Sequence, residues 1–110
     1  MKRGDIVLVT ARGDYGKPCP AVIVQSDLFN STHASLVVCL LTSELVEAPL
    51  FRLSLRPSPE NGLTQVSQIM VDKLIAIPRH RVHDRIGTMD DTTLLALNRC
   101  LALMLGLGGV

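Results

Sequence analysis

MKRGDIVLV at residues 1–9 and GKPCPAVIVQ at residues 16–25 are the two stretches that decide how the fold begins. Each holds a short run of Val, Ile and Leu, which is typical of a buried β-strand. The loop between them carries charged and polar side chains, namely Arg12, Asp14, Tyr15 and Lys17. Such side chains can bind a polyanion but cannot form a core. We therefore expect a functional site at this loop, because binding groups are often carried on loops held by rigid strands.

Cys19 lies between Pro18 and Pro20, at the point where the second stretch begins. A proline fixes its own backbone and restricts the residue before it. The side chain of residue 19 is therefore expected to point in a defined direction.

Composition narrows the class of protein. The chain has 110 residues, which suits one domain spanning residues 1–110. Apolar residues make up 47% of the sequence but aromatic residues only 3%, so the core is expected to consist of Val, Leu, Ile and Met. The net charge of +1 excludes a uniformly basic protein, and any contact with nucleic acid has to be local.

The cysteines and histidines give no sign of a metal site. Cys19, Cys39 and Cys100 are scattered and form no CxxC pair, which argues against a zinc site or a disulfide framework. His80 and His83 could share a metal ion, but a closed site needs about four ligands. We expect no metal and no cofactor. Reduced thiols fit a cytoplasmic protein, and no signal peptide or membrane span is expected, since no apolar run reaches about 18 residues.

The pattern along the chain is rich in strands and then helical. Strands are predicted at residues 6–9, 21–25, 36–41, 51–55, 66–71 and 74–77. The Asn61-Gly62 pair predicts a turn with positive φ. The order of elements predicts an α+β protein that is mainly β.

A helix is predicted near the C-terminus. Thr88 is the expected N-cap and Gly106 the expected stop, with leucines recurring at helical spacing between them. Leucines also fall outside the narrowest apolar stripe, so this helix has apolar surface on more than one side. Either the core wraps around it or a second subunit covers part of it.

Several polar residues can be interpreted in two ways. The basic run at residues 79–85 is expected to be a loop, and could be either a solvated face or a patch that contacts phosphate. Asp72 could pair with a neighbouring cation. Thr42 and Ser43, at a strand end, could form only a local turn. Spacing alone does not decide between structural and functional roles.

A series of short motifs carries a resemblance to a known family. The motifs are RGDI at 3–6, GKPCPAVIV at 16–24, QSDLFN at 25–30, VCLLTS at 38–43, NGL at 61–63, SQI at 67–69, VDK at 71–73 and LGL at 105–107. In this order the chain resembles the MazF/PemK family of toxin endoribonucleases from type II toxin–antitoxin systems. The resemblance runs nearly end to end.

The resemblance implies a fold, partners and a reaction. The implied fold is an SH3-like (PemK/CcdB-like) β-barrel with a C-terminal helix, and the implied assembly is a homodimer. The implied partners are single-stranded RNA, including mRNA, and a cognate antitoxin whose flexible tail lies across the RNA groove. Members of the family cleave RNA at short sequences without a metal. The ribose 2′-OH attacks the neighbouring phosphate and gives a 2′,3′-cyclic phosphate and a 5′-OH end.

The resemblance also assigns site residues. Thr42 matches a catalytic Thr of the family, and Cys19 stands where the family has its catalytic Arg. The residues expected to bind RNA are Arg3, Arg12, Lys17, Ser43, Gln68, Asp72 and Arg81. We expect Arg3, Arg12, Lys17 and Arg81 to line one groove that takes either RNA or an acidic antitoxin tail.

Cys19 is the departure from the family that matters most. A thiol carries no permanent charge and donates weakly, whereas Arg offers a planar fork of donors to phosphate. Loss of one such donor lowers a rate by about 100- to 1000-fold. Lys17 is close in sequence but lacks the fork. Cys19 could be a substitution introduced into an active toxin, which we favour, or the residue of a naturally weakened relative.

Two other functions are compatible with the same fold. One is a CcdB-like poison of DNA gyrase, although those toxins end in Trp-Gly-Ile and this chain ends Gly-Gly-Val and has no Trp. The other is a catalytically dead homologue that only binds antitoxin. Cys19 adds weight to the second.

Overall fold

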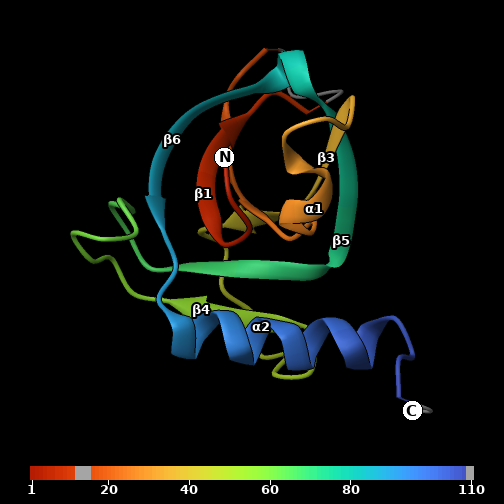
Figure 1. The fold of residues 1–110 in the computed structure, drawn as a ribbon. Coiled ribbons are helices and arrows are strands. Elements are labelled where there is room, and N and C mark those ends of the chain that lie inside the picture. The colour runs from red at the N-terminus through yellow and green to blue at the C-terminus, as the bar shows by residue number, and fades with distance from the viewer. Residues whose placement is uncertain (12–15, 109–110) are drawn as a thin grey trace.

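The computed structural model describes residues 1–11 and 16–108, and Figure 1 shows their arrangement. The elements in chain order are β1 (Asp5–Val9), β2 (Cys19–Ile23), α1 (Asp27–Asn30), β3 (Ser35–Thr42), β4 (Arg52–Leu55), β5 (Ser67–Pro78), the 3₁₀ helix η1 (Arg79–Arg81), β6 (Val82–Thr88) and α2 (Asp91–Met104).

The six strands form one antiparallel sheet in the order β4-β5-β3-β2-β1-β6. The sheet curls, and α2 runs beneath it beside β4 (Figure 1). This confirms the predicted α+β, mainly β class with a C-terminal helix. Among the described residues β4 and β6 are edge strands that do not pair with each other, so the curled sheet is not closed into a barrel.

The strands predicted at residues 66–71 and 74–77 are the two halves of β5. The register between β3 and β5 shifts between Cys39, which pairs with Leu74, and Leu41, which pairs with Ile69. β5 therefore has more residues in this stretch than β3. Such a bulge bends a strand, and β5 turns sharply in Figure 1. The prediction of two strands was wrong because the exposed pair Asp72 and Lys73 interrupts the apolar run at this bend.

The prediction of a loop at residues 79–85 was also wrong. This segment is η1 followed by the first half of β6, which pairs with β1 through Val9–Val82 and Val7–Arg85. β6 is an edge strand in which the polar residues His83, Asp84 and Arg85 are exposed. Charges are common on edge strands because they discourage pairing with other chains, and here they conceal the strand pattern.

The N-cap of α2 lies two residues later than predicted. It is Asp90, whose carboxylate accepts a 2.6 Å hydrogen bond from Thr93 N. The pKa of Asp90 is lowered first by hydrogen bonding to the Thr93 side chain and then by this bond to the Thr93 amide. Thr88 instead ends β6, opposite Asp5. The predicted stop is confirmed, since Gly106 has φ +70° directly after the C-cap Leu105.

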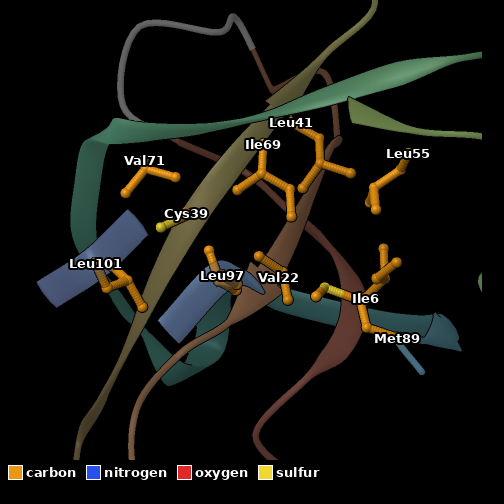
Figure 2. Close-up of a cluster of buried hydrophobic side chains, with 10 residues drawn as sticks. All are labelled: Ile6, Val22, Cys39, Leu41, Leu55, Ile69, Val71, Met89, Leu97 and Leu101. Carbon is orange, nitrogen blue, oxygen red and sulfur yellow. The ribbon is translucent and has the colours of Figure 1, made fainter. Parts of the chain in front are cut away.

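A buried cluster joins the sheet to α2 (Figure 2). Its members are Ile6, Val22, Cys39, Leu41, Leu55, Ile69, Val71, Met89, Leu97 and Leu101. A second cluster lies on the other side of the same strands, with Val7 and Val9 of β1 among its members. Neighbouring residues of a strand point to opposite faces, so the curl of the sheet buries both faces of β1.

Cys39 belongs to the first cluster and is fully buried. Burial raises the pKa of its thiol to about 12, so it is neutral at physiological pH. Cys39 is a small apolar core residue.

Leu97→Ala is expected to lower the free energy of unfolding by about 2–5 kcal/mol, because Leu97 is fully buried between α2 and the sheet. Urea unfolding followed by circular dichroism measures the change. Leu95→Ala is the matched control, since Leu95 lies on the same helix but is 52% exposed. A loss at Leu97 no greater than at Leu95 would contradict the assigned core.

Across residues 1–11 and 16–108, no helix is long and apolar enough to span a membrane.

Candidate functional site

A groove of about 580 Å³ opens where β2 begins and β3 ends. Its lining comes from both strands, from the turn after Asn61 and from β6. The lining residues are Leu8, Lys17, Pro18, Cys19, Pro20, Leu41, Thr42, Ser43, Gly62, Leu63, Thr64, Gln65, Ser67 and Ile86. Lys17 is the charged side chain among these described lining residues.

Strand register brings Cys19 and Thr42 side by side on one wall of this groove. β2 and β3 pair through Ala21–Leu40, Val22–Cys39 and Ile23–Val38. Continuing the same register by two residues places Cys19 opposite Thr42. Cys19 is half-buried, and its Sγ lies 3.8 Å from the main-chain oxygen of Lys17.

The Thr42 hydroxyl is oriented by the main chain that follows it. Its Oγ1 accepts a 3.1 Å hydrogen bond from the Glu44 amide. A hydroxyl has one proton and two lone pairs. Because one lone pair is engaged by Glu44, the Thr42 proton can be donated to an oxygen atom in the groove.

The opposite wall is a turn that the sequence did not assign to the site. Asn61 is buried, and its Oδ1 accepts from the amides of Ser58 and Leu63, while its Nδ2 donates to Arg56 O. These bonds fix residues 58–63, so the first wall residues, Gly62 and Leu63, are held in place.

Gly62 allows the turn to rest directly on β6. Its φ is +69°, which confirms the turn predicted from the Asn61-Gly62 pair. A Cβ at this position would lie 2.0 Å from Ile86 O. The Asn-Gly pair was the available signal, but its contact with β6 is a long-range feature that no local pattern encodes.

The predicted site residues divide into two groups. Cys19, Thr42, Lys17 and Ser43 all line the groove. Arg3, Gln68, Asp72 and Arg81 do not, and Arg12 lies outside the described residues. Among residues 1–11 and 16–108, Arg3, Lys17 and Arg81 therefore do not line one common groove, contrary to the prediction.

Strand direction explains why Arg3 is remote. β1 and β2 are antiparallel, so Cys19 pairs with Val9 at one end while Arg3 lies at the other. There the Arg3 Nε donates to Val24 O at 2.7 Å. The Arg3 amide donates to Asp27 Oδ1 at 2.8 Å, and this bond is the main reason that the pKa of Asp27 is lowered.

The other three residues also lie elsewhere. Asp72 is exposed at the bend of β5, and Arg81 lines a separate pocket beside the second half of that strand. The amide of Gln68 is buried and bonded to Val46. Their contacts with RNA stay predictions.

A second groove, of about 560 Å³, lies between α2 and the strands near α1. Most of its lining is apolar, and Phe29, Leu105 and Leu107 in it are more than half exposed. Arg3 also lines this groove. Within the described residues, no three His, Cys, Asp or Glu side chains cluster in a way that could hold a metal ion.

Residues 2–105 match the sequence model of the PemK-like, MazF-like toxins of type II toxin–antitoxin systems. The chain belongs to this family. A protein of Mycolicibacterium smegmatis named probable endoribonuclease MazF is 41% identical over 110 residues, covering 99% of this chain and 100% of the relative. Endoribonuclease EndoA of Bacillus subtilis is 22% identical, covering 97% of this chain and 96% of the relative. The predicted enzyme class of this toxin agrees with both names.

Solved structures share the fold of this toxin. A mycobacterial endoribonuclease, solved in complex with its cognate antitoxin, superposes with a TM-score of 0.82 at 23% identity, covering 97% of this chain and 96% of that one. Toxin MazF-mt6 of Mycobacterium tuberculosis gives a TM-score of 0.81 at 18% identity, covering 94% and 97%.

Proposed function

We propose that this toxin is an endoribonuclease whose cleavage site is the groove lined by Cys19 and Thr42. The observation that carries the proposal is the register of β2 and β3, which sets residue 19 beside Thr42 in the lining of one open groove. The names of the M. smegmatis and B. subtilis relatives support the same activity.

The groove suits a reaction in which the RNA supplies its own nucleophile. The ribose 2′-oxygen bonds to the adjacent phosphorus while the bond from phosphorus to the 5′-oxygen breaks. The 2′-OH loses a proton, and the leaving 5′-oxygen gains one. The protein's main task is to stabilise the negative charge that grows on the phosphate oxygens.

Two groove residues are placed for that task. Thr42 donates its hydroxyl proton to a phosphate oxygen, and Lys17 contributes positive charge at the rim. Residue 19 faces the same phosphate, and its thiol supplies neither charge nor a strong donor. We therefore propose that the chain binds single-stranded RNA but cleaves it slowly.

End chemistry tests this proposal. The Cys19→Arg variant is incubated with a pool of short RNAs in EDTA, and the products are identified by mass spectrometry. Products with 2′,3′-cyclic phosphate and 5′-OH ends are expected. Products with a 3′-OH and a 5′-phosphate would refute the proposed reaction.

The second candidate is a catalytically inactive toxin that still binds its antitoxin, and Cys19 is the observation that favours it. A single-stranded RNA and the acidic tail of a cognate antitoxin are expected to compete for the groove, because both present negative charge to Lys17. Calorimetric titration of an RNA-saturated sample with the antitoxin tail measures this. Simultaneous saturation by both ligands would contradict a shared groove.

We propose in addition that the toxin is a homodimer that buries the second groove. Leu105 and Leu107 are 52% and 60% exposed there, and exposed apolar patches of this kind mark interfaces.

Leu105→Asp is expected to shift the toxin from dimer to monomer at micromolar concentration, since it places a charge in that apolar surface. Light scattering measures the mass. Leu50→Asp is the matched control, because Leu50 is 65% exposed and does not line this groove. A Leu105→Asp protein that stays dimeric would place the interface elsewhere.

A further inference from the structure

The amide of Gln68 clamps the segment that follows Thr42. Its Oε1 accepts from Val46 N at 3.0 Å, and its Nε2 donates to Val46 O at 3.0 Å and to Ser54 Oγ at 3.3 Å. Gln68 is only 7% exposed. A buried amide with both ends bonded has a fixed orientation.

Arg52 extends the clamp to Glu44. Its Nη1 lies 3.2 Å from Gln68 Oε1 and 3.3 Å from Glu44 O, and it donates to both. Glu44 in turn donates its amide to Thr42 Oγ1. Hydrogen bonds thus connect Gln68 through Arg52 and Glu44 to the hydroxyl in the groove.

Apolar packing does not fix this segment in the described chain. Leu45, Val46 and Leu50 are 54%, 47% and 65% exposed. The conformation of residues 43–50 therefore depends on the polar contacts with Gln68 and Arg52. Among the described residues, no hydrogen-bond partner reaches the buried Nε of Arg52, so the bonds that tie this guanidinium to its surroundings are those of its Nη1 to Gln68 and Glu44.

We propose that Gln68 and Arg52 are positioning residues, which hold Glu44 so that its amide orients the Thr42 hydroxyl toward the phosphate. The catalytic part of this inference rests on the proposed ribonuclease function. It assigns Gln68 a different role from the direct RNA contact expected from sequence.

Gln68→Met tests the proposal, because Met has a similar volume and no amide. In the Cys19→Arg background we expect kcat to fall about 10- to 100-fold, as a small misplacement of a catalytic group does. KM should change by less than about 3-fold, since the groove lining is intact. Gln68→Glu keeps the acceptor for Arg52 and Val46 N, and its loss should be smaller. An unchanged kcat in Gln68→Met, or a Gln68→Glu loss as large as that of Gln68→Met, overturns the proposal.

Amide hydrogen exchange by NMR gives a readout that does not depend on cleavage. In Gln68→Met of the chain with Cys19, the Glu44 amide should exchange at least about 10-fold faster, while amides of the β3 core keep their rates. Unchanged exchange at Glu44, or equal acceleration throughout β3, overturns the proposal. If the Cys19→Arg parent cleaves no RNA, the ribonuclease proposal fails, and this exchange experiment still decides whether Gln68 positions Glu44.

Arg79→Met is the matched control for Arg52→Met. The Arg79 guanidinium also donates to main-chain oxygens, those of Asn30 and His33, but it follows the far end of β5. Arg52→Met should accelerate exchange at Glu44 and lower kcat, whereas Arg79→Met should do neither. Equal effects of the two variants would show a general loss of stability and overturn the positioning role.

Discussion

Cys19→Arg is expected to raise the rate of RNA cleavage by about 100- to 1000-fold over the chain with Cys19. The reason is geometric as well as electrostatic. Residue 19 lies beside Thr42 in the groove lining, and a guanidinium there can grip two phosphate oxygens at once. The measurement is kcat/KM on a fluorogenic RNA, which reports the stabilisation of the transition state.

Binding should change much less than cleavage in the same variant. Lys17 and the rest of the groove lining are the same in both chains, whereas transition-state stabilisation is proposed to be concentrated at residue 19. Cys19→Ser is the control of equal size and should stay as slow as the chain with Cys19. Cys19→Lys should recover only part of the rate, since ammonium lacks the planar fork. Rapid cleavage by the chain with Cys19 would show that this charge is not needed.

Thr42→Val in the Cys19→Arg background is expected to lower kcat by about 100-fold or more. Val has nearly the shape of Thr but neither accepts from the Glu44 amide nor donates into the groove. Single-turnover cleavage separates this loss from weaker binding.

Thr42→Ser is the matched control and should keep most of the activity, because it keeps the hydroxyl. If Thr42→Val cleaves at the rate of its parent, the hydroxyl has no part in the reaction. The role of Thr42 would then be limited to the local turn that its hydrogen bond with the Glu44 amide forms.

Local sequence signals predicted the parts of the fold that carry apolar runs. β1, β2, β3 and α2 were found because Val, Ile and Leu recur at the period of each element. β6 was missed because His83, Asp84 and Arg85 give it the composition of a loop. β5 was divided because its bulge depends on pairing with β3, which the residues of β5 alone do not reveal.

The sequence likewise predicted only part of the candidate site. The family resemblance predicted one site for Cys19, the first residue of β2, and Thr42, the last residue of β3, and strand register brings them together. Arg3 lies at the other end of β1 from Cys19, and a motif does not reveal which end of a strand faces the groove. The clamp from Gln68 to Val46 spans 22 residues of chain and has no local pattern.

The close contact between Gly62 and the main chain of Ile86 has a consequence for synthesis of the toxin. The wall of the groove is supported by β6, and β6 pairs with β1, so the site needs the first and last strands together. A nascent chain that ends before residue 82 contains Cys19 and Thr42 but lacks the support for the opposite wall. We therefore expect that the groove forms only after β6 has been synthesised and has paired with β1.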